Sequence, residues 1–214
     1  MLKLITGLFP KITSFREKAD NLAAERLHLA KPETWNLKKT VVLVGMMGAG
    51  KTAVGKALAG LLDVPFLDSD AEIEAAANMS IAEIFERDGE AFFRDRETEV
   101  IDRLLENSQA VLSTGGGAFL TERNRNLISQ KGVSVWLKAD MDLLWSRVKH
   151  KDTRPLLRTA NPHETLREIY DARVPIYALA DLAVDANPQF TIDTMAGQVV
   201  QTLAKRKDVL EAQT

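Results

Sequence analysis

One segment restricts the fold of this 214-residue chain more than any other: the run GMMGAGKT, from Gly45 to Thr52. It has the GxxxxGK[ST] spacing of a P-loop, and it lies between an apolar run, Val41 to Val44, and an amphipathic helical pattern. In such a strand–loop–helix arrangement, backbone N–H groups and the helix N-terminus surround phosphate groups. We therefore expect Lys51 to contact the terminal phosphates of a nucleotide and the Thr52 hydroxyl to bind Mg²⁺. The alternative, a glycine-rich turn without a ligand, fits so complete a match poorly.

Short β-rich runs alternate with helical patterns from residue 40 onward. Between the first two runs, apolar residues recur at the spacing of one face of a helix. Such alternation predicts an α/β fold, in which helices cover both faces of a mostly parallel sheet and ligands bind beyond the carboxyl ends of the strands. The predicted strands are Val41–Val44, Pro65–Leu67, Ala110–Ser113, Val133–Leu137 and Leu182–Val184.

Local signals predict where helices begin. Ser80 and Glu83 have the spacing of a capping box ahead of an apolar run. Asn161, followed by proline, predicts the N-cap of a helix that runs to about Arg173. The basic stretch 149–160, which precedes that helix, has no clear period and predicts a mobile loop.

Composition and charge exclude several classes of protein. The chain has 28 Lys and Arg against 30 Asp and Glu, a net charge of -2. This balance disfavours a protein that binds a polyanion such as nucleic acid over its whole surface. It has no NKxD guanine-reading motif, and its apolar runs are far shorter than the roughly 20 residues of a membrane-spanning helix. The absence of cysteine excludes disulfides, thiolate metal sites and a cysteine nucleophile, and it fits a reducing compartment.

The first 36 residues differ from the rest of the chain. Ser14 to Leu29 has the apolar spacing of one amphipathic helix, which we expect to lie on the domain or on a neighbouring subunit. A helix that contacts a membrane surface or a partner is the alternative. The segment lacks the apolar core and cleavage site of a signal peptide, and its acidic residues Glu17, Asp20 and Glu25 disfavour a transit peptide. We therefore expect a cytoplasmic protein.

Two polar segments follow predicted strands. Asp68 and Asp70 come after the second strand, where one carboxylate can serve a metal and the other an acceptor hydroxyl. The alternative is an ordinary helix cap. Gly115, Gly116 and Gly117 come after the third strand, where their backbone can form the wall of a cavity and offer N–H groups to a small polar ligand. A flexible turn is the alternative there.

Five motifs occur in order: GMMGAGKT, LDSD, FFRDRE, STGGG and RPLL. Together they resemble shikimate kinase, a small P-loop kinase of the nucleoside-monophosphate-kinase type, over roughly residues 40–200. The resemblance implies transfer of the ATP γ-phosphoryl group to the 3-hydroxyl of shikimate, in the pathway to chorismate and the aromatic amino acids. It also implies a five-stranded parallel sheet of order 2-3-1-4-5 and a lid at about 149–161, within a kinase domain (37–214) that follows an N-terminal helical extension (1–36).

The resemblance also implies roles for single residues. Asp70 would bind the acceptor hydroxyl and act as the base, Asp68 and Thr52 would hold Mg²⁺, and Arg154 in the lid would close on the phosphates. Guanidinium groups suit the shikimate carboxylate. The implied catalytic residues are Asp70, Lys51 and Arg154; the implied shikimate contacts are Asp70, Arg94, Gly115, Gly116, Gly117 and Arg173; the implied nucleotide contacts are Gly48, Ala49, Gly50, Lys51, Thr52, Ala53, Arg147 and Arg154.

Several further interpretations remain open. Arg147 lies where the family often stacks an arginine on adenine, whereas Arg96, Arg103 and Arg167 are expected to be solvated or paired on the surface. A gluconate-kinase-like enzyme and a P-loop protein that no longer phosphorylates shikimate are the competing functions. We expect ATP and shikimate as partners, no nucleic acid, no membrane, and a monomer in which the N-terminal helix is a candidate contact for a partner or a second copy.

Overall fold

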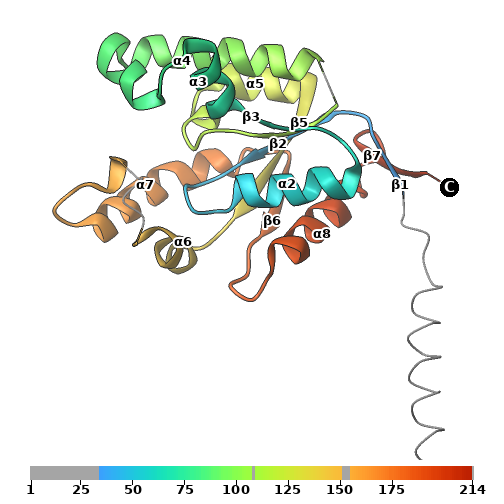
Figure 1. Ribbon diagram of the computed structural model, residues 1–214. Helices are drawn as coiled ribbons and strands as arrows, with labels where there is room; N and C mark the ends of the chain where they lie inside the picture. Colours follow the sequence, from blue (N-terminus) through green and yellow to red (C-terminus); the bar gives the residue numbers. More distant parts are fainter. Residues whose placement is uncertain (1–33, 108, 151–154, 214) are drawn as a thin grey trace, which may run out of the picture. The chain divides into compact units, whose positions relative to one another are not determined.

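A five-stranded parallel sheet lies at the centre of the structure (Figure 1). The structure, a computed structural model, describes residues 34–107, 109–150 and 155–213. Across the sheet the order is β3-β4-β2-β5-β6, which is 2-3-1-4-5 when these five strands are numbered along the chain. The predicted fold class and strand order are therefore confirmed. The strands are β2 (Thr40–Val44), β3 (Phe66–Asp68), β4 (Val111–Ser113), β5 (Gly132–Lys138) and β6 (Leu182–Asp185).

The register of the sheet brings the predicted site segments to one edge. Every residue of the central strand β2 is buried, as expected of a strand covered on both faces. Leu43 of β2 pairs with Ser113 of β4, which in turn pairs with Asp68 of β3. Because all three strands are parallel, the loops that follow them leave the sheet at the same edge.

Helices cover both faces of the sheet. In Figure 1, α2 and α8 lie side by side on one face, and α4 and α5 lie on the other. The helices are α2 (Lys51–Leu62), α3 (Ser69–Ala77), α4 (Ile81–Asn107), α5 (Glu122–Lys131), α6 (Met141–Val148), α7 (Pro162–Tyr177) and α8 (Ile192–Leu203), with short 3-10 turns η1 (Ala118–Leu120) and η2 (Pro155–Leu157).

The predicted helix starts are confirmed. The Glu83 N–H donates to Ser80 Oγ over 3.3 Å, and the Ser80 N–H donates to the Glu83 carboxylate over 2.7 Å, which completes the capping box. Asn161 caps α7 through its side-chain oxygen. This helix continues four residues past the expected end, to Tyr177, and contains Pro175 in its last turn.

A second, two-stranded sheet was not predicted. It pairs β1 (Thr34–Leu37) with β7 (Leu210–Gln213), and Leu37 and Leu210 are both buried in the core. Residues 34–36 are thus part of a strand, although the sequence placed them in a helical extension. The predicted helix at 14–29 lies outside the described residues, so the extension itself stays a prediction.

The hydrophobic core has two parts. The larger part surrounds the central sheet. A smaller cluster, in which Ile73, Ile84 and Phe93 are fully buried, joins α3 to α4. In the part of the chain that the structure describes, no helix combines the length and apolar character needed to cross a membrane.

Candidate active site

The P-loop lies between the buried strand β2 and α2, and two of its glycines have positive φ values. It connects the end of β2 at Val44 to the start of α2 at Lys51. Gly48 and Gly50 have φ values of 83° and 98°, a region that residues with a Cβ rarely adopt. The loop N–H groups therefore precede the N-terminus of α2 in the arrangement that favours an anion.

Two basic side chains contact carbonyl groups of the P-loop. Lys51 Nζ donates to the Gly45 carbonyl over 2.8 Å and to the Met46 carbonyl over 3.2 Å. Arg147, from the last turn of α6, donates to the carbonyls of Gly48 and Ala49, each over 3.2 Å. Both cations thus lie against the backbone of the P-loop. A stack of Arg147 on adenine stays a prediction.

Asp68 has two structural contacts. Its Oδ1 accepts hydrogen bonds from the Asp70 and Ala71 N–H groups, so Asp68 is the N-cap of α3. Its Oδ2 lies 3.4 Å from Thr52 Oγ1 at the start of α2. The alternative interpretation, in which Asp68 caps a helix, is therefore confirmed. The cap leaves the second carboxylate oxygen beside the Thr52 hydroxyl.

Asp70 faces the glycine run. A Cβ on Gly115 would lie only 2.7 Å from Asp70 Oδ1, so the carboxylate occupies space that a larger residue would fill. Burial raises the pKa of the Asp70 carboxyl, and the neighbouring Asp68 adds to the rise, whereas Lys51 opposes it. An acid with a raised pKa beside a P-loop is a candidate general base.

Arg94 lies at the other end of the glycine run. A Cβ on Gly117 would lie 2.8 Å from both Nη1 and Nη2 of Arg94. The guanidinium pairs with Glu97 over 2.9 Å and with Glu90 over 3.0 Å, and Glu97 is only 1% exposed. Burial raises the pKa of Glu97 even though Arg94 acts to lower it. The pairs hold Arg94 against the glycine run, with a little under a third of its side chain exposed to solvent.

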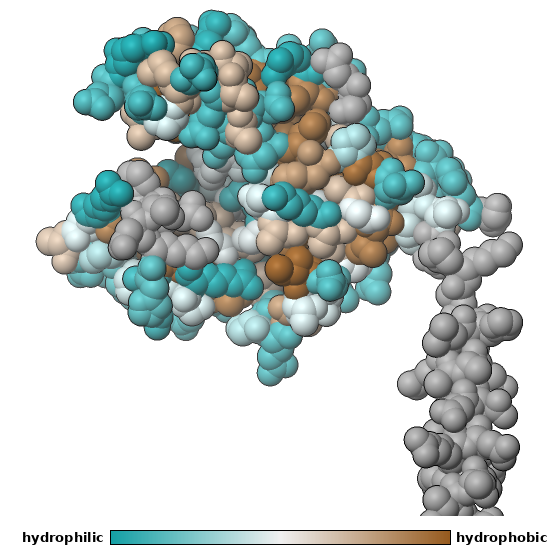
Figure 2. All heavy atoms as spheres, viewed as in Figure 1, coloured by the Kyte–Doolittle hydropathy of each residue, from teal (hydrophilic) through white to brown (hydrophobic). Residues whose placement is uncertain are grey.

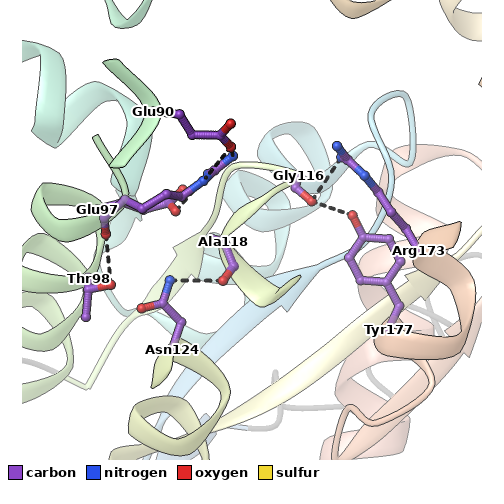
Figure 3. A network of polar contacts seen from close by, with 9 residues as sticks. Glu90, Glu97, Thr98, Gly116, Ala118, Asn124, Arg173 and Tyr177 are labelled. Carbon is purple, nitrogen blue, oxygen red and sulfur yellow. Dashed lines mark hydrogen bonds and ion pairs between the residues drawn. The ribbon is translucent and has the colours of Figure 1, made fainter. Parts of the chain in front are cut away.

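Between these two groups, α7 contacts the glycine run (Figure 3). The Tyr177 hydroxyl donates to the Gly116 carbonyl over 2.5 Å, and Arg173 Nη1 donates to the same oxygen over 3.4 Å. Gly116 also approaches the P-loop, since a Cβ there would lie 3.8 Å from the Met47 N atom and 3.9 Å from the Gly45 carbonyl oxygen. The three glycines thus lie among Asp70, Arg94, Arg173 and the P-loop.

A cavity of about 500 Å³ runs along the P-loop. Figure 2 shows the surface hollowed between the region of α3 and α4 and the region of α6 and α7. The cavity is lined by residues 47–54, Asp68, Asp70, residues 113–116 and Arg147, and at its far end by Ala186, Asn187, Phe190, Thr191, Ile192 and Met195. Ala186, Phe190, Ile192 and Met195 make the lining of this end largely apolar, as is common in small-molecule sites.

The structure therefore brings the predicted site residues together, except for Arg154, which lies outside the described residues. Arg96, Arg103 and Arg167 pair with Glu99, Glu72 and Glu164 on the surface, as expected. The sequence did not predict that residues 186–195 line the cavity. Their position after the carboxyl end of β6 was an available signal, because ligands bind at that edge of a parallel sheet. Sequence reasoning also missed Glu97, for which the i,i+3 spacing to Arg94 was an available signal.

Comparison with known proteins identifies the family to which the chain belongs. A family model described as shikimate kinase matches residues 47–204. The shikimate kinase of Ruegeria pomeroyi is 70% identical over 175 residues, which cover 82% of this chain and 90% of that protein. The shikimate kinase of Cereibacter sphaeroides is 66% identical over 175 residues, which cover 82% of this chain and 87% of that protein. This chain belongs to the shikimate kinase family.

As a member of this family, the chain is an ATP-dependent small-molecule kinase. A solved shikimate kinase from Acinetobacter baumannii, in complex with shikimate, aligns with a TM-score of 0.74 at 40% identity and covers 79% of this chain and 94% of that one. A gluconokinase from Sinorhizobium meliloti has a TM-score of 0.53 at 17% identity, which shows a shared fold alone.

Proposed function

We propose that this member of the shikimate kinase family transfers the γ-phosphoryl group of ATP to the 3-hydroxyl of shikimate and releases ADP and shikimate 3-phosphate. One observation carries the proposal: the glycine run that touches Asp70, Arg94 and Arg173 also lies against the P-loop. An acceptor bound on these glycines therefore meets the terminal phosphate of a nucleotide bound in the loop. Such proximity supplies much of the rate of a phosphoryl transfer.

The acceptor has a carboxylate and hydroxyl groups, and the site offers a partner for each. Arg94 and Arg173 bind the carboxylate, since a guanidinium matches it with two parallel hydrogen bonds. Asp70 accepts the hydroxyl proton as the oxygen attacks phosphorus. Its raised pKa makes its carboxylate a better proton acceptor than that of an ordinary aspartate.

The nucleotide side rests on the P-loop. The loop N–H groups and Lys51 stabilise the negative charge that spreads over the transferred group. Arg147 adds a second cation at the loop, 3.2 Å from the carbonyls of Gly48 and Ala49. Arg154, on the lid, is proposed to close on the phosphates and exclude water, which otherwise competes as the acceptor.

The residues near the P-loop fit a magnesium ion. Thr52 and Asp68 place a hydroxyl and a carboxylate oxygen side by side, and Mg²⁺ prefers oxygen ligands of this kind, with phosphates and water completing its shell. Because Asp68 Oδ1 caps α3, Oδ2 is the oxygen that would be available to hold the ion. When bound, Mg²⁺ neutralises phosphate charge during the transfer.

We also propose that the enzyme acts as a cytoplasmic monomer. The residues proposed to bind ATP and shikimate that the structure describes gather around the P-loop and the glycine run 115–117, an arrangement that does not require a second copy. Size-exclusion chromatography with light scattering at several concentrations measures the mass; a stable dimer would contradict this part of the proposal.

A coupled ADP-release assay with three acceptor conditions tests the function. The enzyme is supplied with ATP and Mg²⁺ together with shikimate, gluconate or no acceptor, and the phosphorylated product is identified by mass spectrometry. We expect turnover with shikimate and only slow hydrolysis otherwise. Turnover with gluconate alone would support the competing kinase, and the same slow rate in all three conditions would support a protein that no longer phosphorylates shikimate.

A further inference from the structure

The carbonyl group of Gly116 has an unusual pair of donors. It points toward α7, where it accepts the Tyr177 hydroxyl over 2.5 Å and Arg173 Nη1 over 3.4 Å (Figure 3). The first distance is that of a strong hydrogen bond, whereas the second is near the limit for one. Tyr177 is therefore the main group that fixes this carbonyl.

The direction of that carbonyl also determines the direction of the next N–H group. The peptide unit between Gly116 and Gly117 is planar and trans, because the described chain contains no cis peptide bond. In a trans unit the C=O and the N–H point in opposite directions. With the carbonyl held toward α7, the Gly117 N–H must point to the opposite side.

On that side the Gly117 N–H is unpaired as far as the described residues are concerned. Within residues 34–107, 109–150 and 155–213, no acceptor for it is found, while the neighbouring Ala118 and Leu120 N–H groups bond to Gly115 and Gly117 carbonyls. The Arg94 guanidinium lies against Gly117. A free N–H beside a guanidinium is a site for an anionic oxygen.

The geometry points to Tyr177 as a positioning residue for the acceptor: its hydroxyl holds the Gly116 carbonyl toward α7 and thereby turns the Gly117 N–H toward the acceptor carboxylate. This inference rests on the proposed function, since that function supplies the carboxylate. Tyr177 itself does not touch the acceptor. It acts through one peptide group.

Two observations favour the tyrosine over Arg173 in this role. The Arg173 contact with the Gly116 carbonyl, at 3.4 Å, is near the limit for a hydrogen bond, whereas the Tyr177 contact is short. The Tyr177 ring is fully buried and stacks with Trp136 at 6.3 Å between ring centroids, so its hydroxyl has little freedom to move. Burial also raises the pKa of Tyr177, which keeps the hydroxyl protonated as a donor.

Tyr177→Phe in the full chain is the test, because it removes the hydroxyl and keeps the ring. Tyr170→Phe is the matched control, since Tyr170 is the other tyrosine of the chain and lies on the same helix, partly buried. Loss of one hydrogen bond predicts a rise of about threefold to tenfold in the KM for shikimate and in its Kd by calorimetry. We expect the kcat and the KM for ATP to change by less than about twofold, because the carboxylate lies away from the reacting hydroxyl.

Each other outcome has a definite meaning. An unchanged KM for shikimate in Tyr177→Phe, with or without a lower melting temperature, would overturn the inference and leave the hydroxyl a purely structural group. Equal rises in the KM for both substrates would also overturn it, since they indicate a general distortion. If the wild-type enzyme does not turn over shikimate, the proposed function fails and takes this inference with it, so the two failures are distinguishable.

Discussion

Gly117→Ala is the substitution for which the structure makes the sharpest prediction. Gly117 has φ of -92° and ψ of -20°, a conformation that alanine adopts without strain. The backbone therefore does not require glycine at this position. What requires it is space, because the added Cβ would lie 2.8 Å from Nη1 and Nη2 of Arg94 and 3.1 Å from its Cζ.

The size of the effect follows from these distances. An ordinary contact begins at 3.4 Å, so the Arg94 guanidinium must move by at least about 0.6 Å. The guanidinium can move because the Arg94 side chain is partly exposed. Its hydrogen bonds to Glu97 and to a bound carboxylate would both become longer. A misplacement of this order predicts a rise of about tenfold to a hundredfold in the KM for shikimate. The fold and the KM for ATP should change little.

Steady-state kinetics of Gly117→Ala, with Gly60→Ala as the control, measures this effect. Gly60 lies on the exposed side of α2, and a Cβ there meets no atom within 4 Å. The control should keep wild-type kinetics and gain about 0.5–1 kcal/mol of stability, as expected when alanine replaces glycine in a helix. A wild-type KM for shikimate in Gly117→Ala would refute the assignment of Arg94 to the carboxylate.

Three further predictions follow from the site. Asp70→Asn should lower kcat by about 10² or more. Burial raises the pKa of Asp70 in the folded protein, so the ionised carboxylate destabilises the fold at a pH above that pKa. The same variant should therefore have a higher melting temperature than the wild type at pH 7, and this difference should disappear below pH 3.8, the pKa of the carboxyl in the unfolded chain. Chelation by EDTA should abolish turnover until Mg²⁺ is restored, and activity unaffected by EDTA would contradict the proposed metal. A chain that begins at Thr34 should keep kcat and both KM values, since Trp35–Ala212 forms one compact unit; a large loss on truncation would assign the first 33 residues to the active enzyme.

The central sheet was predictable because local patterns and tertiary structure agree there. The strand runs are short, apolar and separated by amphipathic helical patterns, so each strand was located to within one or two residues. The two-stranded sheet was not predictable in this way. Its strands, TWNL and LEAQ, have mostly exposed residues and no apolar run. Only Leu37 and Leu210 are buried in the core, while Trp35 packs against the core and is partly buried.

In the candidate site, too, one part was predictable from the sequence and another part was not. The P-loop was predictable because phosphate binding needs glycine, lysine and threonine at fixed spacing along one segment. The contact of Tyr177 with Gly116 joins residues 61 positions apart, and Tyr177 is the last residue of α7, two positions after Pro175. No local pattern reports a pairing that two separate elements create when they pack.

Asp68 shows why two interpretations of one residue need not compete. A cap requires one carboxylate oxygen facing the first N–H groups of α3, and a magnesium ligand requires one oxygen facing the P-loop. The structure gives Oδ1 to the cap and directs Oδ2 toward Thr52. The cap then holds the carboxylate in place, so the structural role supports the proposed functional one.

The glycines of the two loops are required for different physical reasons. Gly48 and Gly50 in the P-loop have positive φ values, so a side chain there would strain the backbone itself. The glycine run 115–117 has no such values, and there Gly115 and Gly117 leave room for the charged groups of Asp70 and Arg94. Substitution in the P-loop should therefore damage the loop conformation, whereas substitution at Gly115 or Gly117 should displace one charged side chain and leave the backbone in place. Glycine in the P-loop allows a backbone conformation, whereas glycine in the run 115–117 allows charged groups to approach closely. Only the residues that pack against each loop distinguish these two roles.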